Sequence, residues 1–101
     1  MKKVIVMSEL DNVATALESI DLGEGISVDI FGRGWELKAK APIPFGHKIA
    51  IRPIKKGENV IKYGEVIGVA TEDIDIGDWV HVHNVASLRG RGDLIEKERR
   101  G

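Results

Sequence analysis

The fold is decided by the stretch Ile43-Pro44-Phe45-Gly46-His47-Lys48-Ile49, which is one of four copies of a single pattern. Each copy has an isoleucine, two residues, a glycine, two more residues and an isoleucine or valine, and the other copies occupy residues 20–26, 54–60 and 74–80. Glycine reaches the positive φ of a tight turn, and β-branched residues at both ends favour strands that are anchored in a core. Because the copies are irregularly spaced, the pattern is not that of a solenoid. It predicts a small all-β domain with glycine turns at short intervals.

The segments between these turns predict where the strands lie. Short runs rich in β-branched and apolar residues predict strands at 3–7, 27–31, 36–40, 48–51, 65–70 and 79–83, with a hairpin tip at Gly32-Arg33-Gly34. Residues 11–19 instead have a helical spacing of apolar side chains, and Asp11 is placed to be the N-cap of a helix. The expected fold is therefore all-β with a small α content, in the form of one short helix near the N-terminus.

Length and composition limit the class of protein. The 101 residues predict one domain, residues 1–93, followed by a charged and flexible tail, residues 94–101. Fifteen basic and sixteen acidic side chains nearly cancel, which argues against nucleic acid and membrane partners, and no apolar run is long enough to span a bilayer. The absence of cysteine excludes disulfides and thiolate metal sites, and we expect a cytoplasmic protein.

Two histidines stand out in the last expected strand. His81 and His83 are two residues apart, so in a strand they share a face with Trp79, opposite Val80 and Val82. Neighbouring imidazoles can bind a metal ion or exchange protons with a substrate. The alternative is that both are surface residues on an edge strand. Three histidines and scattered acids do not predict a complete metal site within this chain.

His47 differs from the corresponding residue in the other three copies of the pattern. The residue after the glycine is acidic in those copies, where it is suited to capping local backbone amides, whereas here it is histidine followed by Lys48. The exchange indicates a turn that binds an anionic ligand. The alternative is neutral drift at a position that tolerates substitution.

Three further polar residues are weaker candidates for substrate binding. Asn12 and Asn84 each offer a donor and an acceptor to a polyol. Arg89, in the glycine-flanked segment before the tail, offers a guanidinium suited to a carboxylate, although it also fits a solvated hinge.

Four linked motifs resemble the N-terminal SAF-type domain of the altronate and galactarate dehydratase family. They are Asp-Asn-Val-Ala-Thr-Ala-Leu at 11–17, the segments 43–50 and 60–68, and His-Val-His-Asn at 81–84. The resemblance covers residues 10 to 93 and extends to the small subunit of sulfolactate sulfo-lyase. It implies a β-clip fold, which agrees with the strands and glycine turns inferred from the residues.

The resemblance also implies an activity. Family members remove water from a sugar acid and depend on a divalent metal, iron or manganese. The histidines His47, His81 and His83 match the family motifs as catalytic residues, with His81 and His83 also as metal ligands. Lys48 and Asn84 match as substrate-binding residues. We expect them to line the mouth of a shared active site, with Lys48 holding the substrate carboxylate.

The large domain of the fused family members has no counterpart in these 101 residues. We therefore expect a small subunit, inactive alone, that binds a large catalytic subunit and a sugar-acid substrate. The alternatives are the small subunit of a sulfolactate-type lyase and a stand-alone SAF module that binds carbohydrate. Residues 8–10 depart from the family, since many relatives carry a His-Pro pair there.

Overall fold

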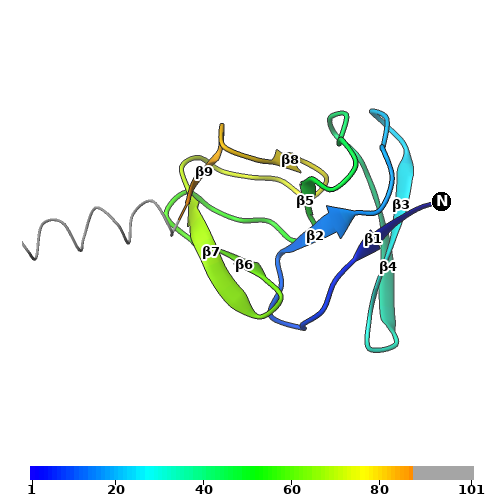
Figure 1. The fold of residues 1–101 in the computed structure, drawn as a ribbon, viewed down its shortest axis with the longest axis horizontal. Coiled ribbons are helices and arrows are strands. Elements are labelled where there is room, and N and C mark those ends of the chain that lie inside the picture. Colours follow the sequence, from blue (N-terminus) through cyan, green and yellow to red (C-terminus); the bar gives the residue numbers. More distant parts are fainter. Residues whose placement is uncertain (88–101) are drawn as a thin grey trace, which may run out of the picture.

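The computed structural model describes residues 1–87, which form nine strands and no helix (Figure 1). The strands are β1 (Lys2–Ile5), β2 (Val13–Ala16), β3 (Gly25–Ile30), β4 (Arg33–Lys38), β5 (Lys48–Ala50), β6 (Asn59–Lys62), β7 (Glu65–Ala70), β8 (Trp79–Val80) and β9 (Val85–Ser87). The all-β prediction is confirmed, and the short, curled sheets are those expected of a β-clip. The predictions for Arg89, for the end of the domain at residue 93 and for the tail at 94–101 lie outside the described residues.

The strands form two sheets. The larger has the order β4-β3-β1-β2-β5-β8, and the smaller has the order β6-β7-β9. Strands β1 and β3 are parallel, and all the other pairs of strands are antiparallel. Within residues 1–87 no helix is long and apolar enough to cross a membrane.

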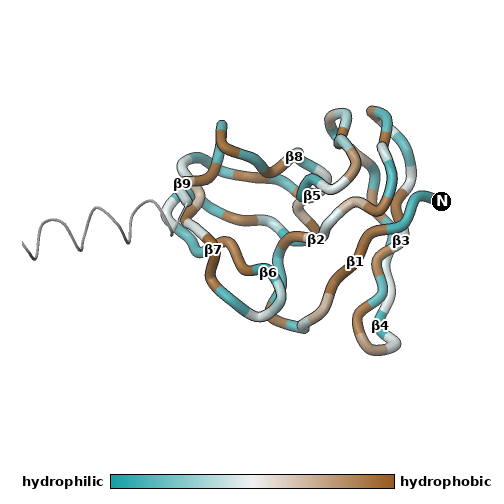
Figure 2. Tube along the Cα trace, viewed as in Figure 1, coloured by the Kyte–Doolittle hydropathy of each residue, from teal (hydrophilic) through white to brown (hydrophobic). Residues whose placement is uncertain are grey.

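Strands β2 and β5 separate two hydrophobic cores. Ala14 and Ile49 belong to the larger core, whereas their neighbours Val13 and Ala50 belong to the smaller core, which also contains Val60 and Val80. Successive side chains of a strand point to opposite faces, so a strand between two cores is apolar at consecutive positions. Figure 2 shows apolar segments along the interior strands and hydrophilic segments in many of the connecting turns.

The four copies of the glycine pattern form four equivalent turns that associate in pairs. The first isoleucines of two copies, Ile20 and Ile43, exchange backbone hydrogen bonds of 2.8 and 2.9 Å, and Ile54 and Ile74 do the same at 2.7 and 2.9 Å. All four glycines have φ between 82° and 93°. Each glycine N–H donates to the carbonyl of a buried alanine: Ala39, Ala16, Ala70 or Ala50. The pattern therefore predicted the turns correctly, and it is also the unit that joins them.

The predicted helix over residues 11–19 is wrong, because its centre is the strand β2. Val13, Ala14 and Ala16 are all buried, on both faces of the strand, which a helix with a single apolar stripe would not allow. Asp11 does cap backbone amides, but they are those of the preceding loop and of a distant hairpin. Its carboxylate accepts hydrogen bonds from the N–H groups of Met7 at 3.2 Å, Ser8 at 3.3 Å and Gly64 at 2.8 Å.

The hairpins have two-residue turns. Strands β3 and β4 are joined by Phe31 and Gly32, so the predicted tip at 32–34 lies one residue too far along the chain. Phe31 and Tyr63, which begins the turn between β6 and β7, both have positive φ and are followed by glycines that also do. This is the arrangement of a type I′ turn, which matches the twist of paired strands. Strands β6 and β9 were not predicted.

Candidate functional site

The three histidines and Trp79 form one cluster. The rings of Trp79 and His81 are stacked, with centroids 5.2 Å apart and 9° between their planes. His47 lies 4.6 Å from His81 between ring centroids, and His83 lies 5.1 Å from Trp79. The indole Nε1–H donates to His47 Nδ1 at 3.2 Å, which leaves Nε2 as the hydrogen-bearing nitrogen of a neutral His47 ring. The structure thus brings together all the histidines that the sequence singled out.

Pro44 explains why His47 is free to join this cluster. In the other three turns the acid after the glycine accepts a hydrogen bond from the N–H of the second residue: Glu24 from Asp21 at 2.8 Å, Glu58 from Lys55 at 2.7 Å and Asp78 from Asp75 at 2.8 Å. The second residue of the remaining copy is Pro44, which has no N–H to cap. An acid at position 47 would have no such donor, so this turn keeps its shape without one.

Asn84 positions His81. The predicted strand 79–83 ends at Val80, and residues 81–84 form a turn. The side chain of Asn84, only 3% exposed, accepts from the His81 N–H and donates to the Trp79 carbonyl, both at 2.9 Å. Val80 and Val82, expected to share one face of a strand, are separated by this turn: Val80 is buried and Val82 is 82% exposed.

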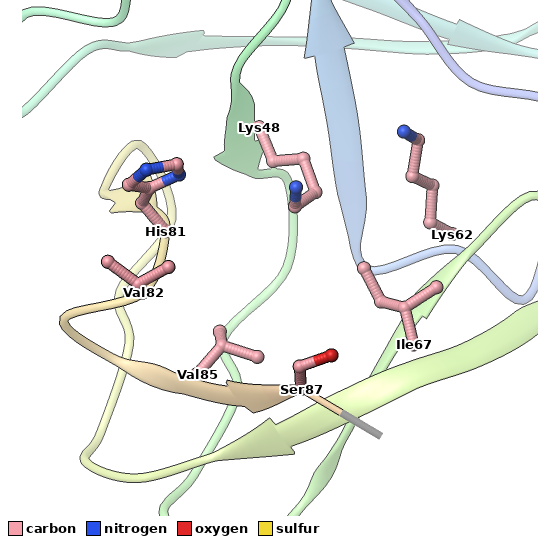
Figure 3. A pocket seen from close by; sticks show the side chains of 7 residues that line it. All are labelled: Lys48, Lys62, Ile67, His81, Val82, Val85 and Ser87. Carbon is pink, nitrogen blue, oxygen red and sulfur yellow. The ribbon is translucent and has the colours of Figure 1, made fainter. Parts of the chain in front are cut away.

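Next to this cluster lies a cleft of about 350 Å³ between the two sheets (Figure 3). One part of its wall is polar, with Lys48 from β5, Lys62 from β6 and His81. The remainder is mostly apolar, apart from one hydroxyl group, and consists of Ile67, Val82, Val85 and Ser87. None of the described residues that line this cleft is acidic, so the cleft is suited to an anion.

The electrostatic surroundings lower the pKa of two of these groups. Partial burial lowers the pKa of the Lys48 ammonium, and the charge of Lys62 lowers it further. The pKa of His81 is lowered by partial desolvation, by His47, by Lys48 and by His83. Both shifts disfavour positive charge, so they favour the neutral imidazole of His81, the form that can accept a proton.

Lys62 was missed as a site residue, although it lies in a motif that carried the family resemblance. Its place in the cleft depends on the packing of β6 beside β2, which no local sequence pattern reports. Asn12 is not among the residues that line the cleft. Its amide bonds to the backbone of β6, donating to the Asn59 carbonyl and accepting from the Ile61 N–H, both at 2.8 Å. These bonds give Asn12 a role in joining the two sheets.

A complete metal site does not form from the described residues. Within residues 1–87, no three histidine or acidic side chains are grouped closely enough to hold a metal ion. The rings of His81 and His83 both pack against Trp79, and one nitrogen of His47 is already bonded to that indole. Any metal bound here would require additional ligands from outside this part of the chain.

Comparison with known proteins places these features in a family. Residues 2–88 match the altronate/galactarate dehydratase SAF domain. The chain belongs to this SAF domain family. This SAF domain is 42% identical over 84 residues to altronate dehydratase from Bacillus subtilis (strain 168), which covers 83% of the chain and 16% of that enzyme. It is 38% identical over 76 residues to galactarate dehydratase (L-threo-forming) from Escherichia coli (strain K12), or 75% of the chain and 14% of the enzyme.

A second kind of relative is much shorter. The SAF domain is 47% identical over 55 residues to the (2R)-sulfolactate sulfo-lyase subunit alpha of Paracoccus pantotrophus, covering 54% of the chain and 82% of that subunit. The chain thus spans less than a fifth of the two dehydratases and most of the sulfo-lyase subunit. The named relatives are lyases, and the SAF unit occurs both within a long enzyme and as a separate subunit.

Proposed function

We propose that this chain is a cytoplasmic SAF subunit of a sugar-acid dehydratase of the altronate/galactarate type, and that it forms one wall of an active site completed by a large catalytic subunit. The observation that carries the proposal is the cleft in which Lys48 and Lys62 lie beside His81. A cation that holds a carboxylate, next to a neutral imidazole that can move a proton, is suited to the loss of water from a hydroxy acid.

In this proposal each residue has a distinct task. Lys48 binds the substrate carboxylate, and His81 exchanges a proton with the reacting hydroxyl or carbon. Asn84 holds the turn that presents His81, while His47 and His83 pack around Trp79 and fix the orientation of the cluster. Arg89 is a further proposed contact to the substrate, whereas the Asn12 amide is already bonded to β6 and joins the two sheets.

The divalent iron or manganese ion that the resemblance implies would have to take ligands from the large subunit, with His81 or His83 as the contribution of this chain. When bound, such an ion supplies Lewis acidity to the departing hydroxyl group. The residues of this chain orient the substrate and transfer the proton.

The test is to coexpress the chain with the products of neighbouring genes, purify any complex and measure its turnover of altronate and galactarate. We expect a stable complex whose turnover falls by at least about a hundredfold in the double variant His81→Ala, His83→Ala, because general acid–base groups contribute on that order. Lys55→Gln is the control, since Lys55 is exposed and does not line the cleft. A complex with unchanged turnover in the double variant would show that the histidines are structural. If the chain finds no large partner and the isolated chain binds neutral sugars, it is a stand-alone carbohydrate-binding module.

The second candidate is a subunit of a sulfo-lyase that acts on a sulfonated hydroxy acid. It is favoured by the match to a separate subunit alpha, since the chain covers 82% of that protein and 79% of the corresponding subunit of Chromohalobacter salexigens. The same purified complex distinguishes the two candidates, because a sulfo-lyase releases sulfite from sulfolactate and a dehydratase does not.

A further inference from the structure

The positive charge of the cleft is not balanced within the described part of the chain. Lys2 and Lys40 both form ion pairs, with Glu18, Glu24 and Asp75 at 3.2 to 3.8 Å. Neither Lys48 nor Lys62 has a carboxylate within ion-pair distance among residues 1–87. The Lys62 ammonium lies over the ring of Tyr63, 4.9 Å from its centroid. Two cations therefore line one cleft without a counter-charge from the described residues.

The two lysines approach the cleft from different sheets. Lys48 begins β5 of the larger sheet, and Lys62 ends β6 of the smaller sheet. Figure 3 shows the two ammonium groups on either side of strand β2 in that view, above the wall formed by Ile67, Val85 and Ser87. Two separate cationic points favour a ligand that carries charge at more than one place.

The remainder of the wall limits the size and character of the ligand. Four side chains offer aliphatic surface or a single hydroxyl, and His81 adds one imidazole. A volume of about 350 Å³ is at the small end of the range for ligand pockets. The cleft thus fits a small molecule with anionic groups and few other polar contacts on its apolar side.

We propose that this cleft selects a small organic dianion, with Lys48 and Lys62 each binding one anionic group. The inference rests on the proposed function, because it names the substrate class of the same site. A monoanion would neutralise only one ammonium group. The other ammonium would remain without a counter-charge, so a dianion makes a second favourable contact that a monoanion cannot make.

The test measures binding of two matched acids to the full 101-residue chain. Galactarate and galactonate share a six-carbon polyol chain, and galactarate has a second terminal carboxylate where galactonate has a hydroxymethyl group. Titrations followed by backbone amide NMR at constant ionic strength should show galactarate binding at least tenfold more tightly, with shifts at residues 48, 62 and 81–87. Equal affinities, or no binding of either acid at tens of millimolar, would overturn the inference.

Replacing single lysines by glutamine tests which residues cause the preference for galactarate over galactonate. Lys62→Gln should lower galactarate affinity by about tenfold and reduce the preference over galactonate to less than threefold, and Lys48→Gln should do the same. Lys55→Gln should leave both affinities unchanged, because Lys55 is exposed in a turn and does not line the cleft. If Lys62→Gln bound galactarate as tightly as the parent chain does, the two-point arrangement would be wrong.

The outcomes separate this inference from the proposed function. A chain that forms an active complex with a large subunit but binds galactarate and galactonate equally would retain the function and lose the dianion preference. A chain that prefers galactarate through both lysines but never joins a large subunit would retain the inference and lose the subunit role.

Discussion

At the scale of the residue, His81 has unusual surroundings. Its ring is stacked on Trp79, lies close to His47 and shares the cleft with Lys48. Desolvation and the nearby positive or titratable groups lower its pKa below the ordinary 6.5. A group that binds a proton less readily in the folded than in the unfolded state makes folding less favourable as the pH falls. His81 should therefore reduce the free energy of unfolding as the pH drops through and below 6.5.

Titration of the imidazole signals by NMR checks this directly. His81 should titrate below the same residue in a denatured or peptide reference, and Lys48→Gln should raise its pKa toward the ordinary value by removing a positive charge. Lys55→Gln should leave the His81 pKa unchanged. A His81 that titrates at or above the reference would contradict the described surroundings, in which His47, Lys48 and His83 are the titratable neighbours.

Single residues also show how far the sequence could predict the site. The two-residue spacing of His81 and His83, and the exchange of acid for histidine at position 47, led to the three imidazole rings of the cluster. The role of Asn84 in closing the turn depends on two hydrogen bonds of one side chain, and a strand pattern does not report them. The result is that the residues of the cluster were predicted and their geometry was not.

At the scale of the element, two glycine turns of the same pattern differ in the space around them. Gly57 and Gly77 have φ of +89° and +93°, but a Cβ at Gly57 meets nothing within 4 Å, whereas one at Gly77 would clash with the Lys38 carbonyl oxygen. Gly57→Ala should cost about 1 kcal/mol, from backbone conformation alone. Gly77→Ala should cost about 2 kcal/mol more, because the turn at 74–80 must move away from Lys38.

Urea unfolding of the two variants measures the difference, and each variant is the control for the other. Equal losses of stability in Gly57→Ala and Gly77→Ala would mean that the backbone near Lys38 shifts at no cost in free energy. A larger loss for Gly57→Ala would contradict the close packing of the last turn.

Strand β2, which lies between the two cores, was predicted as a helix. Strand β2 is only four residues long, and its consecutive buried side chains have no alternation to distinguish a strand from a buried helix. Strands β3 and β7, which do alternate in burial over part of their length, were placed within two residues of their actual bounds. An alternation of apolar and polar residues identifies a strand only where one face of the strand is buried and the other is exposed.

At the scale of the whole molecule, Asp11 connects parts that are far apart in sequence. Its carboxylate is fully buried and accepts from the N-terminal loop and from Gly64 in the β6–β7 turn, while Arg52 donates to its carbonyl at 3.2 Å. Asp11→Asn would place an amide N–H₂ group against backbone N–H donors. We expect it to lower the free energy of unfolding by about 3 kcal/mol, because buried donors lose their acceptor.

The matched control is Asp29→Asn. Asp29 is exposed, and its side chain accepts a single hydrogen bond, from the Gly32 N–H at 3.1 Å, which asparagine can also accept. This variant should change stability by less than about 0.5 kcal/mol. Comparable losses in the two variants would show that burial of the Asp11 contacts contributes little.

The overall class was predictable because it depends on a repeated local signal, the glycine turn between β-branched residues. The pairing of the copies was not, because it depends on which turns meet in space: Ile20 with Ile43, and Ile54 with Ile74. The cleft also depends on long-range arrangement, since Lys48 comes from the larger sheet and Lys62 from the smaller sheet. Local turns, in short, were easier to infer than the long-range arrangement that creates the site.

Pro44 has a consequence for how such a site can arise during evolution. In a turn whose second residue keeps its N–H, changing the acid to histidine would remove that donor's acceptor and weaken the turn at once. If proline comes first, the acid loses its partner but remains solvated, and the next change at position 47 is close to neutral. One of four similar turns could thus acquire a new side chain without an intermediate that folds poorly, while the other three keep the hydrogen bond between the acid and the backbone.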